Sequence, residues 1–131
     1  MIEGGCLCAR VRYCVDELED DVSHCHCSMC RRMHGAAFGT YAGVKGDGFR
    51  WLQGEDLVKN YRSSPGVVRT FCSNCGSTLQ FIAEGPPRRI ELALGTVVGD
   101  PGVRPTHHIF TGSKAPWFDI TDDLLQHEAH D

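Results

Sequence analysis

Short runs that alternate between apolar and polar residues dominate this chain, and they predict strands. Residues 6–15 alternate in this way, which is typical of one half-buried strand. Because side chains on a strand repeat every two residues, Cys6 and Cys8 would leave this strand on the same face. The pattern predicts further strands over residues 36–44, 49–52, 57–62, 67–72, 78–82, 90–94 and 106–111. We therefore expect a chain of the all-β class.

Turn-forming residues separate these runs and leave space for one short helix. The 15 Gly and 6 Pro of the chain favour many turns between short strands. Residues 63–66, with the sequence Ser-Ser-Pro-Gly, lie between two of the expected strands and indicate a hairpin. Ser28 is expected to cap a short helix over residues 29–34, which Gly35 would end. The acidic residues 16–21 are expected to form a solvated turn.

The length and charge of the chain narrow the classes of function. With 131 residues, the chain is expected to form a single domain, residues 1–131. The formal net charge of −4 and the lack of a long basic run argue against nucleic acid or an anionic membrane as partner. The sequence shows no signal peptide, and no apolar run approaches the roughly 18 residues of a membrane helix. We therefore expect a cytoplasmic protein, whose thiols stay reduced. No oligomeric state is predicted.

Most of the 8 cysteines fall into closely spaced groups, which favours metal binding over isolated thiols. Residues 72–76 have the form of a zinc knuckle, a tight turn in which glycine supplies a positive φ. Two cysteine pairs from distant parts of the chain are typical of a closed, structural zinc site. Cys14 lies outside the groups and is interpreted as an ordinary residue. The groups are Cys6 with Cys8, Cys25 with Cys27 and Cys30, and Cys72 with Cys75.

The group Cys25, Cys27 and Cys30 supplies three thiols from one short segment. Three protein ligands with an exchangeable fourth position are the pattern of catalytic zinc, which can hold a substrate thiol as its thiolate. Arg31 and Arg32 follow directly and are candidates to bind an anionic substrate. Two alternatives stay open: a histidine closes the site, or the cysteines form a redox group without metal. The candidate histidines are His24, His26 and His34.

A series of motifs follows in order along the chain, over about residues 4–126. They are Gly4-Gly5-Cys6-Leu7-Cys8, Val11-Arg12-Tyr13, Cys25-His26-Cys27-Ser28-x-Cys30-Arg31-Arg32, Gly35-Ala36-Ala37-Phe38, Tyr61-x-Ser63-Ser64, Arg69-x-Phe71-Cys72-x-x-Cys75-Gly76-Ser77, His108-Ile109-Phe110 and Lys114-Ala115-Pro116-Trp117-Phe118. Together they resemble the glutathione-dependent formaldehyde-activating enzyme family, which also includes centromere protein V. The chain departs from the family pattern at Ala9, where a glycine is common, and at His34, where a small polar residue is usual.

The resemblance implies a zinc-stabilised β-tent of antiparallel sheets with little helix, and two zinc ions per chain. The family reaction joins formaldehyde to glutathione to give S-hydroxymethylglutathione and is classed with the carbon–sulfur lyases. A small thiol such as glutathione is therefore the expected substrate, and His108 is a candidate for proton transfer or substrate contact. By the resemblance, the structural zinc falls on Cys6, Cys8, Cys72 and Cys75, and the zinc tied to activity on Cys25, Cys27 and Cys30.

Two functions of other classes stay open beside this enzyme. One is a binding module that zinc stabilises and that has no catalytic activity, because the same scaffold can serve for docking alone. The other is a thiol redox sensor, in which Cys25, Cys27 and Cys30 would form disulfides under mild oxidation. A closed second metal site would favour the first of these, and rapid disulfide formation would favour the second.

Overall fold

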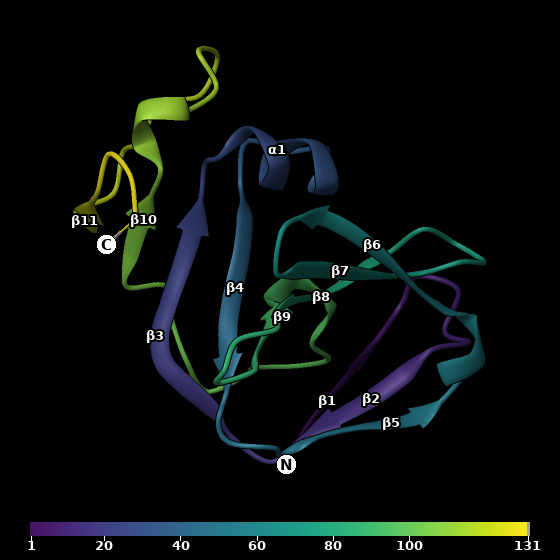
Figure 1. Cartoon of the computed structure of the whole chain (residues 1–131). Helices are drawn as coiled ribbons and strands as arrows, with labels where there is room; N and C mark the ends of the chain where they lie inside the picture. Colours follow the sequence, from purple (N-terminus) through teal and green to yellow (C-terminus); the bar gives the residue numbers. More distant parts are fainter. Residues whose placement is uncertain (131) are drawn as a thin grey trace.

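Two β-sheets make up most of the computed structural model, which describes residues 1–130. The smaller sheet consists of β1 (Ile2–Gly5), β2 (Arg12–Val15) and β5 (Phe49–Gln53), in the order β1-β2-β5. The larger sheet contains β3 (Leu18–Cys25), β4 (Gly39–Val44), β6 (Val58–Ser64), β7 (Val67–Cys72), β8 (Thr78–Ala83), β9 (Arg89–Ala93), β10 (His107–Ile109) and β11 (Leu125–Gln126). Its strand order is β11-β10-β3-β4-β9-β8-β7-β6, and Figure 1 shows the smaller sheet below β6 to β8. The expected all-β class is confirmed.

Antiparallel pairing predominates, as expected, with two exceptions at one edge of the larger sheet. β10 pairs in parallel with both β3 and β11. The hairpin expected around residues 63–66 is present, since β6 and β7 pair antiparallel across Gly66, whose φ is 76°. None of the helices that the structure describes has the length and apolar character needed to cross a membrane.

The main apolar core lies between the two sheets. Tyr13 and Val15 of β2 pack there with Val22, Ala42 and Leu92 of the larger sheet, and all five side chains are fully buried. The hydroxyl of Tyr13 also forms a hydrogen bond of 2.7 Å with the hydroxyl of Thr96. Burial of this kind contributes roughly 1.5–3 kcal/mol for each large apolar side chain and holds the sheets together.

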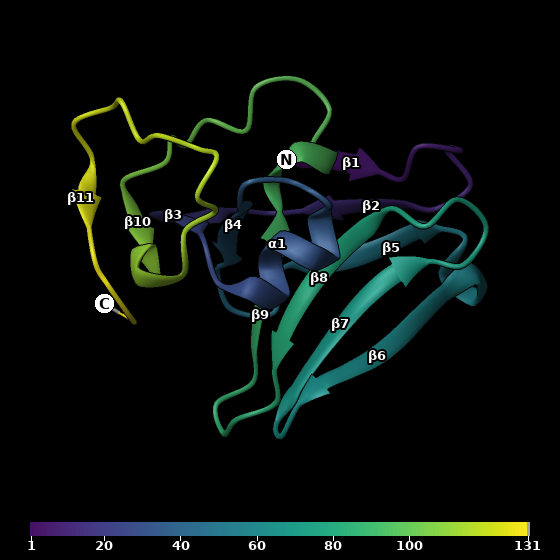
Figure 2. The same cartoon turned by 90° about the horizontal axis from the view of Figure 1, so that it is seen from above.

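The single expected helix is present as α1 (Ser28–His34), but its N-cap is not Ser28. Cys27 occupies the cap position, and its thiol accepts a hydrogen bond of 3.3 Å from the backbone N–H of Cys30. Gly35 ends the helix in the left-handed conformation, as expected. Figure 2 shows α1 above the larger sheet. Three short 3-10 turns complete the helical content: η1 (Glu55–Leu57), η2 (Leu94–Thr96) and η3 (Thr111–Ser113).

The expectation of one strand over residues 6–15 is wrong. β1 ends at Gly5, and a turn closed by the Ala9 N–H on the Cys6 carbonyl separates it from β2. Ala9 lies in the left-handed region with φ of 65°, which no strand residue adopts. Cys6 and Cys8 therefore converge through a turn and not through strand alternation.

Residues 16–21 form no separate solvated turn, because β3 already begins at Leu18. Leu18 is buried in the core, while Glu19 is partly exposed and Asp20 and Asp21 are exposed. The C-terminal residues supply β11 beside β10, and the His127 N–H donates to the carbonyl of His108. Figure 2 shows this segment along the outer edge of the sheet.

Candidate metal centres and cavity

Four cysteines from two distant segments meet beside the smaller sheet. Their Sγ atoms all lie within 4.8 Å of one another, with 3.5 Å between Cys6 and Cys8 and 3.9 Å between Cys8 and Cys72. A tetrahedral zinc with Zn–S bonds of about 2.3 Å separates its sulfurs by about 3.8 Å. Cys75 completes the set. The donors therefore fit a closed four-coordinate site, as the spacing predicted.

These four thiols, which we call the four-cysteine cluster, differ in pKa: hydrogen bonding lowers the pKa of Cys8 and Cys75, whereas burial raises that of Cys72. The N–H of Val11 donates to the sulfur of Cys6 over 3.3 Å. The Ser77 hydroxyl, 3.3 Å from the sulfur of Cys75, lowers the pKa of that thiol to about 5. Gly76 has the positive φ of 85° expected of a zinc knuckle. Apolar neighbours, Leu79 among them, pack against the cluster, in which Cys6 and Cys72 are buried and Cys8 and Cys75 are partly exposed.

Three further cysteines meet where β3 runs into α1, and we call them the three-cysteine cluster. Cys25 ends β3, Cys27 caps the helix and Cys30 lies in its first turn, and the sulfurs lie within 4.8 Å of one another. Hydrogen bonding among the thiols lowers the pKa of Cys27 to about 2 and raises that of Cys25. Among the described residues, no other His, Cys, Asp or Glu joins this group.

None of the three histidines that could have closed this site joins the group of ligand atoms, and each has one ring nitrogen beside another side chain. Nε2 of His34 lies 2.7 Å from the hydroxyl of Tyr41, and Nδ1 of His24 lies 2.8 Å from the hydroxyl of Thr40. Nε2 of His26 lies 2.8 Å from Nδ1 of His108. Among the residues that the structure describes, the three-cysteine cluster therefore has three side-chain donors and leaves a fourth position for another ligand.

That fourth position faces a cavity of about 580 Å³, which is lined by all three cysteines and by Tyr41, Arg69 and Phe81. Arg69 is only 4% exposed, and its guanidinium donates to the sulfur of Cys30 over 3.6 Å and to the Tyr41 hydroxyl over 3.4 Å. The same group lies 5.1 Å from the centroid of the Phe81 ring. A fixed positive charge therefore stands beside the thiols.

Sequence reasoning did not single out Arg69 as a site residue, although one signal could have found it. In β7, alternation places Arg69 on the same face as Val67, and both side chains line the cavity. An arginine on the apolar face of a strand is typical of a buried, functional charge. The residues that were singled out, Arg31, Arg32 and His108, are not among those that line the cavity.

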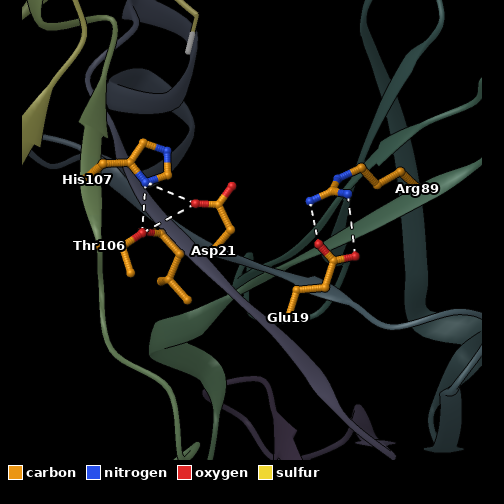
Figure 3. A network of polar contacts seen from close by, with 6 residues as sticks. Glu19, Asp21, Arg89, Thr106 and His107 are labelled. Carbon is orange, nitrogen blue, oxygen red and sulfur yellow. Dashed lines mark hydrogen bonds and ion pairs between the residues drawn. The ribbon is translucent and has the colours of Figure 1, made fainter.

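A network of charged side chains borders the cavity away from the cysteines. Figure 3 shows Arg89 paired with Glu19, at 3.0 and 3.4 Å, and Nδ1 of His107 lying 3.3 Å from the carboxylate of Asp21. Burial also raises the pKa of Glu91, which lines the cavity beside them. The cavity therefore has a thiol end with Arg69 and a mixed acidic and basic end.

Residues 1–113 match the family model of the glutathione-dependent formaldehyde-activating enzyme. The chain belongs to this family. An uncharacterized lyase of Schizosaccharomyces pombe is 33% identical to this family member over 79 residues, or 60% of the chain. The match spans 56% of the yeast protein.

A crystal structure of a Rhodobacter sphaeroides protein shares the fold of this glutathione-dependent formaldehyde-activating enzyme family member. The two superpose with a TM-score of 0.63 at 24% sequence identity, over 79% of this chain and 91% of the other. Family membership thus confirms the resemblance inferred from the motifs, although the matched region begins and ends earlier than the range of 4–126 expected from them.

Proposed function

We propose that this protein is a zinc-dependent carbon–sulfur lyase of the glutathione and formaldehyde type. Its substrates would be a small thiol and an aldehyde, or the S-hydroxymethyl adduct that the two form. The observation that carries the proposal is the three-cysteine cluster, which has no fourth side-chain donor among the described residues and faces a cavity of about 580 Å³. Family membership and the lyase name of the yeast relative support the reaction class.

Two metal sites with different roles belong to this proposal. The four-cysteine cluster would hold a structural zinc, and Cys25, Cys27 and Cys30 would hold the zinc tied to activity. When bound there, zinc lowers the pKa of a substrate thiol and polarises an aldehyde carbonyl. Three thiolates and one Zn²⁺ carry a net negative charge, which the buried guanidinium of Arg69 balances at 3.6 Å from Cys30.

Side chains around the cavity would bind the thiol and handle its proton. Formation of the carbon–sulfur bond transfers the thiol proton, overall, to the former carbonyl oxygen. Burial raises the pKa of Tyr41 well above its ordinary value, so its hydroxyl stays protonated and can donate to that oxygen. Arg69 can bind a substrate carboxylate. Arg31, Arg32 and His108 stay candidates for substrate contact, although none of them lines the cavity.

The direct test is acceleration of adduct formation. Because formaldehyde and glutathione combine without a catalyst, their exchange with S-hydroxymethylglutathione should be followed by ¹³C exchange spectroscopy with and without protein. We expect the wild type to accelerate exchange and Cys25→Ser to abolish the acceleration. Cys14→Ala is the matched control, because Cys14 is buried but belongs to neither cluster. Exchange at the uncatalysed rate with zinc-loaded wild type would contradict the proposal.

A redox sensor is a second candidate, because the three sulfurs lie within reach of one another. Their separation of at most 4.8 Å would allow two of them to form a disulfide after a small movement once metal is absent. Mild hydrogen peroxide and mass spectrometry would decide between the two. Rapid disulfide formation in the zinc-loaded protein favours the sensor, whereas oxidation only after zinc removal favours the enzyme.

A further inference from the structure

A pair of buried histidines that do not line the cavity begins in the segment that carries the three-cysteine cluster. His26 stands between two of the cluster cysteines, yet it does not line the cavity that Cys25 and Cys27 line. His26 and His108 are 0% and 1% exposed. Nε2 of His26 lies 2.8 Å from Nδ1 of His108, and Nε2 of His108 lies 3.0 and 3.1 Å from the carboxylate oxygens of Asp122.

The hydrogen-bonding capacity of these groups orders the chain in one direction. An ionised carboxylate only accepts, so Nε2 of His108 carries a proton and donates to Asp122. In the neutral imidazole, Nδ1 of His108 is then the acceptor, and Nε2–H of His26 donates to it. Nδ1 of His26 then carries a lone pair and no proton, and this atom is buried with no hydrogen-bond partner.

The backbone of His26 also bonds to β10, the strand that carries His108. Its N–H donates to the carbonyl of Ile109 over 3.0 Å. His108 is held in turn by the N–H of His127, which donates to its carbonyl over 2.9 Å. The side chain and the backbone N–H of His26 therefore each bond to β10, in addition to the parallel pairing of β3 with β10 that ends at Cys25. The C-terminal residues support β10 from its other side.

We propose that Asp122 is a positioning residue for the three-cysteine cluster. Acting through His108 and His26, its carboxylate fixes the tautomers and ring orientations that keep Cys25 and Cys27 in their ligating geometry. Asp122 itself touches neither the cysteines nor the cavity. It lies beyond residue 113, where the match to the family model ends, so the C-terminal segment supplies this support. The inference rests on the proposed binding of zinc by the cluster.

Outer groups that orient metal-binding segments typically change metal affinity by about 10- to 100-fold when they are removed. Asp122→Ala should therefore release zinc from the three-cysteine cluster about tenfold faster than the wild type. Asp122→Asn keeps an oxygen that accepts from His108, so this variant should release zinc at close to the wild-type rate. Asp123→Ala is the matched control, because it removes the same charge from the next residue along the chain.

The experiment follows zinc release to 4-(2-pyridylazo)resorcinol from the full-length protein loaded with zinc alone. Two zincs per chain with a fast and a slow phase are expected, and only the fast phase should respond to Asp122→Ala. An unchanged fast phase in this variant would overturn the positioning role. A wild type that binds one zinc would overturn the proposed function itself, so the two failures are distinguishable.

Imidazole ¹⁵N spectra give a second test, and its wild-type measurement does not depend on any variant folding. We expect His108 and His26 both to carry their proton on Nε2. In Asp122→Ala the spectrum of His108 should shift toward the other tautomer, which a role confined to packing would not produce. A wild-type His108 protonated on Nδ1 would overturn the inference.

Discussion

The two cysteine clusters offer the same ligand atom in different surroundings. The four-cysteine cluster joins two segments more than 60 positions apart and packs against Val11 and Leu79 in an apolar environment. The three-cysteine cluster comes from one short segment and opens on a cavity beside Arg69. Under the proposed function, donor number and surroundings, and not the identity of the ligand, would separate a site that closes the fold from one that binds a substrate.

The difference also lies in what each cluster contributes to folding. Zinc bound at the four-cysteine cluster would cross-link distant parts of the chain, so the free energy of zinc binding would add to the free energy of folding. The three-cysteine cluster spans only β3 and the first turn of α1, both of which have other contacts, including the pairing of β3 with β4 and β10. Loss of metal from the second cluster should therefore cost activity more than stability.

The largest effect is expected from Cys72→Ser. It removes a fully buried ligand of the four-cysteine cluster, and structural zinc contributes about 10 kcal/mol or more to folding. We expect little soluble protein, with the remainder unfolded by circular dichroism. A folded variant that keeps a full complement of zinc would contradict the structural role of this cluster.

Cys25→Ser should separate activity from folding. The variant is expected to lose turnover and one equivalent of zinc, because two thiolates bind zinc far more weakly than three. Its far-ultraviolet circular dichroism and cooperative unfolding should stay close to those of the wild type. Global unfolding of Cys25→Ser would show that both clusters are structural, and the comparison between them would fail.

The predictions for Cys72→Ser and Cys25→Ser depend on cysteine groups that the sequence alone indicated. Cysteine spacing alone gave the same two groups of thiols that the structure brings together, because cysteines in one tight turn have to be close in sequence. The hairpin of β6 and β7 was also predicted, since Gly66 marks its turn. The turn that carries Cys6 and Cys8 was missed because its residues happen to alternate like a strand, although Ala9 has φ of 65°.

Contacts between residues that are distant in sequence could not be predicted from the sequence. The parallel pairing of β10 with β3, and the contact of Asp122 with His108, join residues whose proximity only the fold determines. Arg69 is similar, because its burial depends on Phe81 and Tyr41 from neighbouring strands. Candidate site residues that depend on tertiary contacts therefore needed the structure, whereas candidate metal ligands close in sequence did not.

Arg69→Gln tests whether the cavity beside the three-cysteine cluster binds an anionic thiol. Hydrogen bonds to charged groups contribute about 1.5–3 kcal/mol, so we expect kcat/KM to fall about 10- to 100-fold, mainly through KM. Arg62→Gln is the matched control, because Arg62 forms an exposed ion pair with Glu84 on the same sheet. Equal kcat/KM for the two variants would show that Arg69 does not bind the substrate.

The smallest effect concerns the turn of the four-cysteine cluster. A left-handed conformation costs a non-glycine residue roughly 1–2 kcal/mol, so Ala9→Gly should raise the free energy of unfolding by about 1 kcal/mol. Urea denaturation of the zinc-loaded protein measures this change. Ala36→Gly serves as the control, because Ala36 has no positive φ and should gain nothing. A less stable Ala9→Gly would contradict the turn geometry described here.

The most direct test of the two-cluster account is metal content during graded chelation. Protein purified anaerobically without a histidine tag should contain about two zinc ions per chain, by elemental analysis alongside circular dichroism. We expect a mild chelator to remove one equivalent while the fold survives, and the second to leave only as the protein unfolds. A single zinc per chain, or loss of both together with the fold, would contradict the division into a structural and a functional cluster.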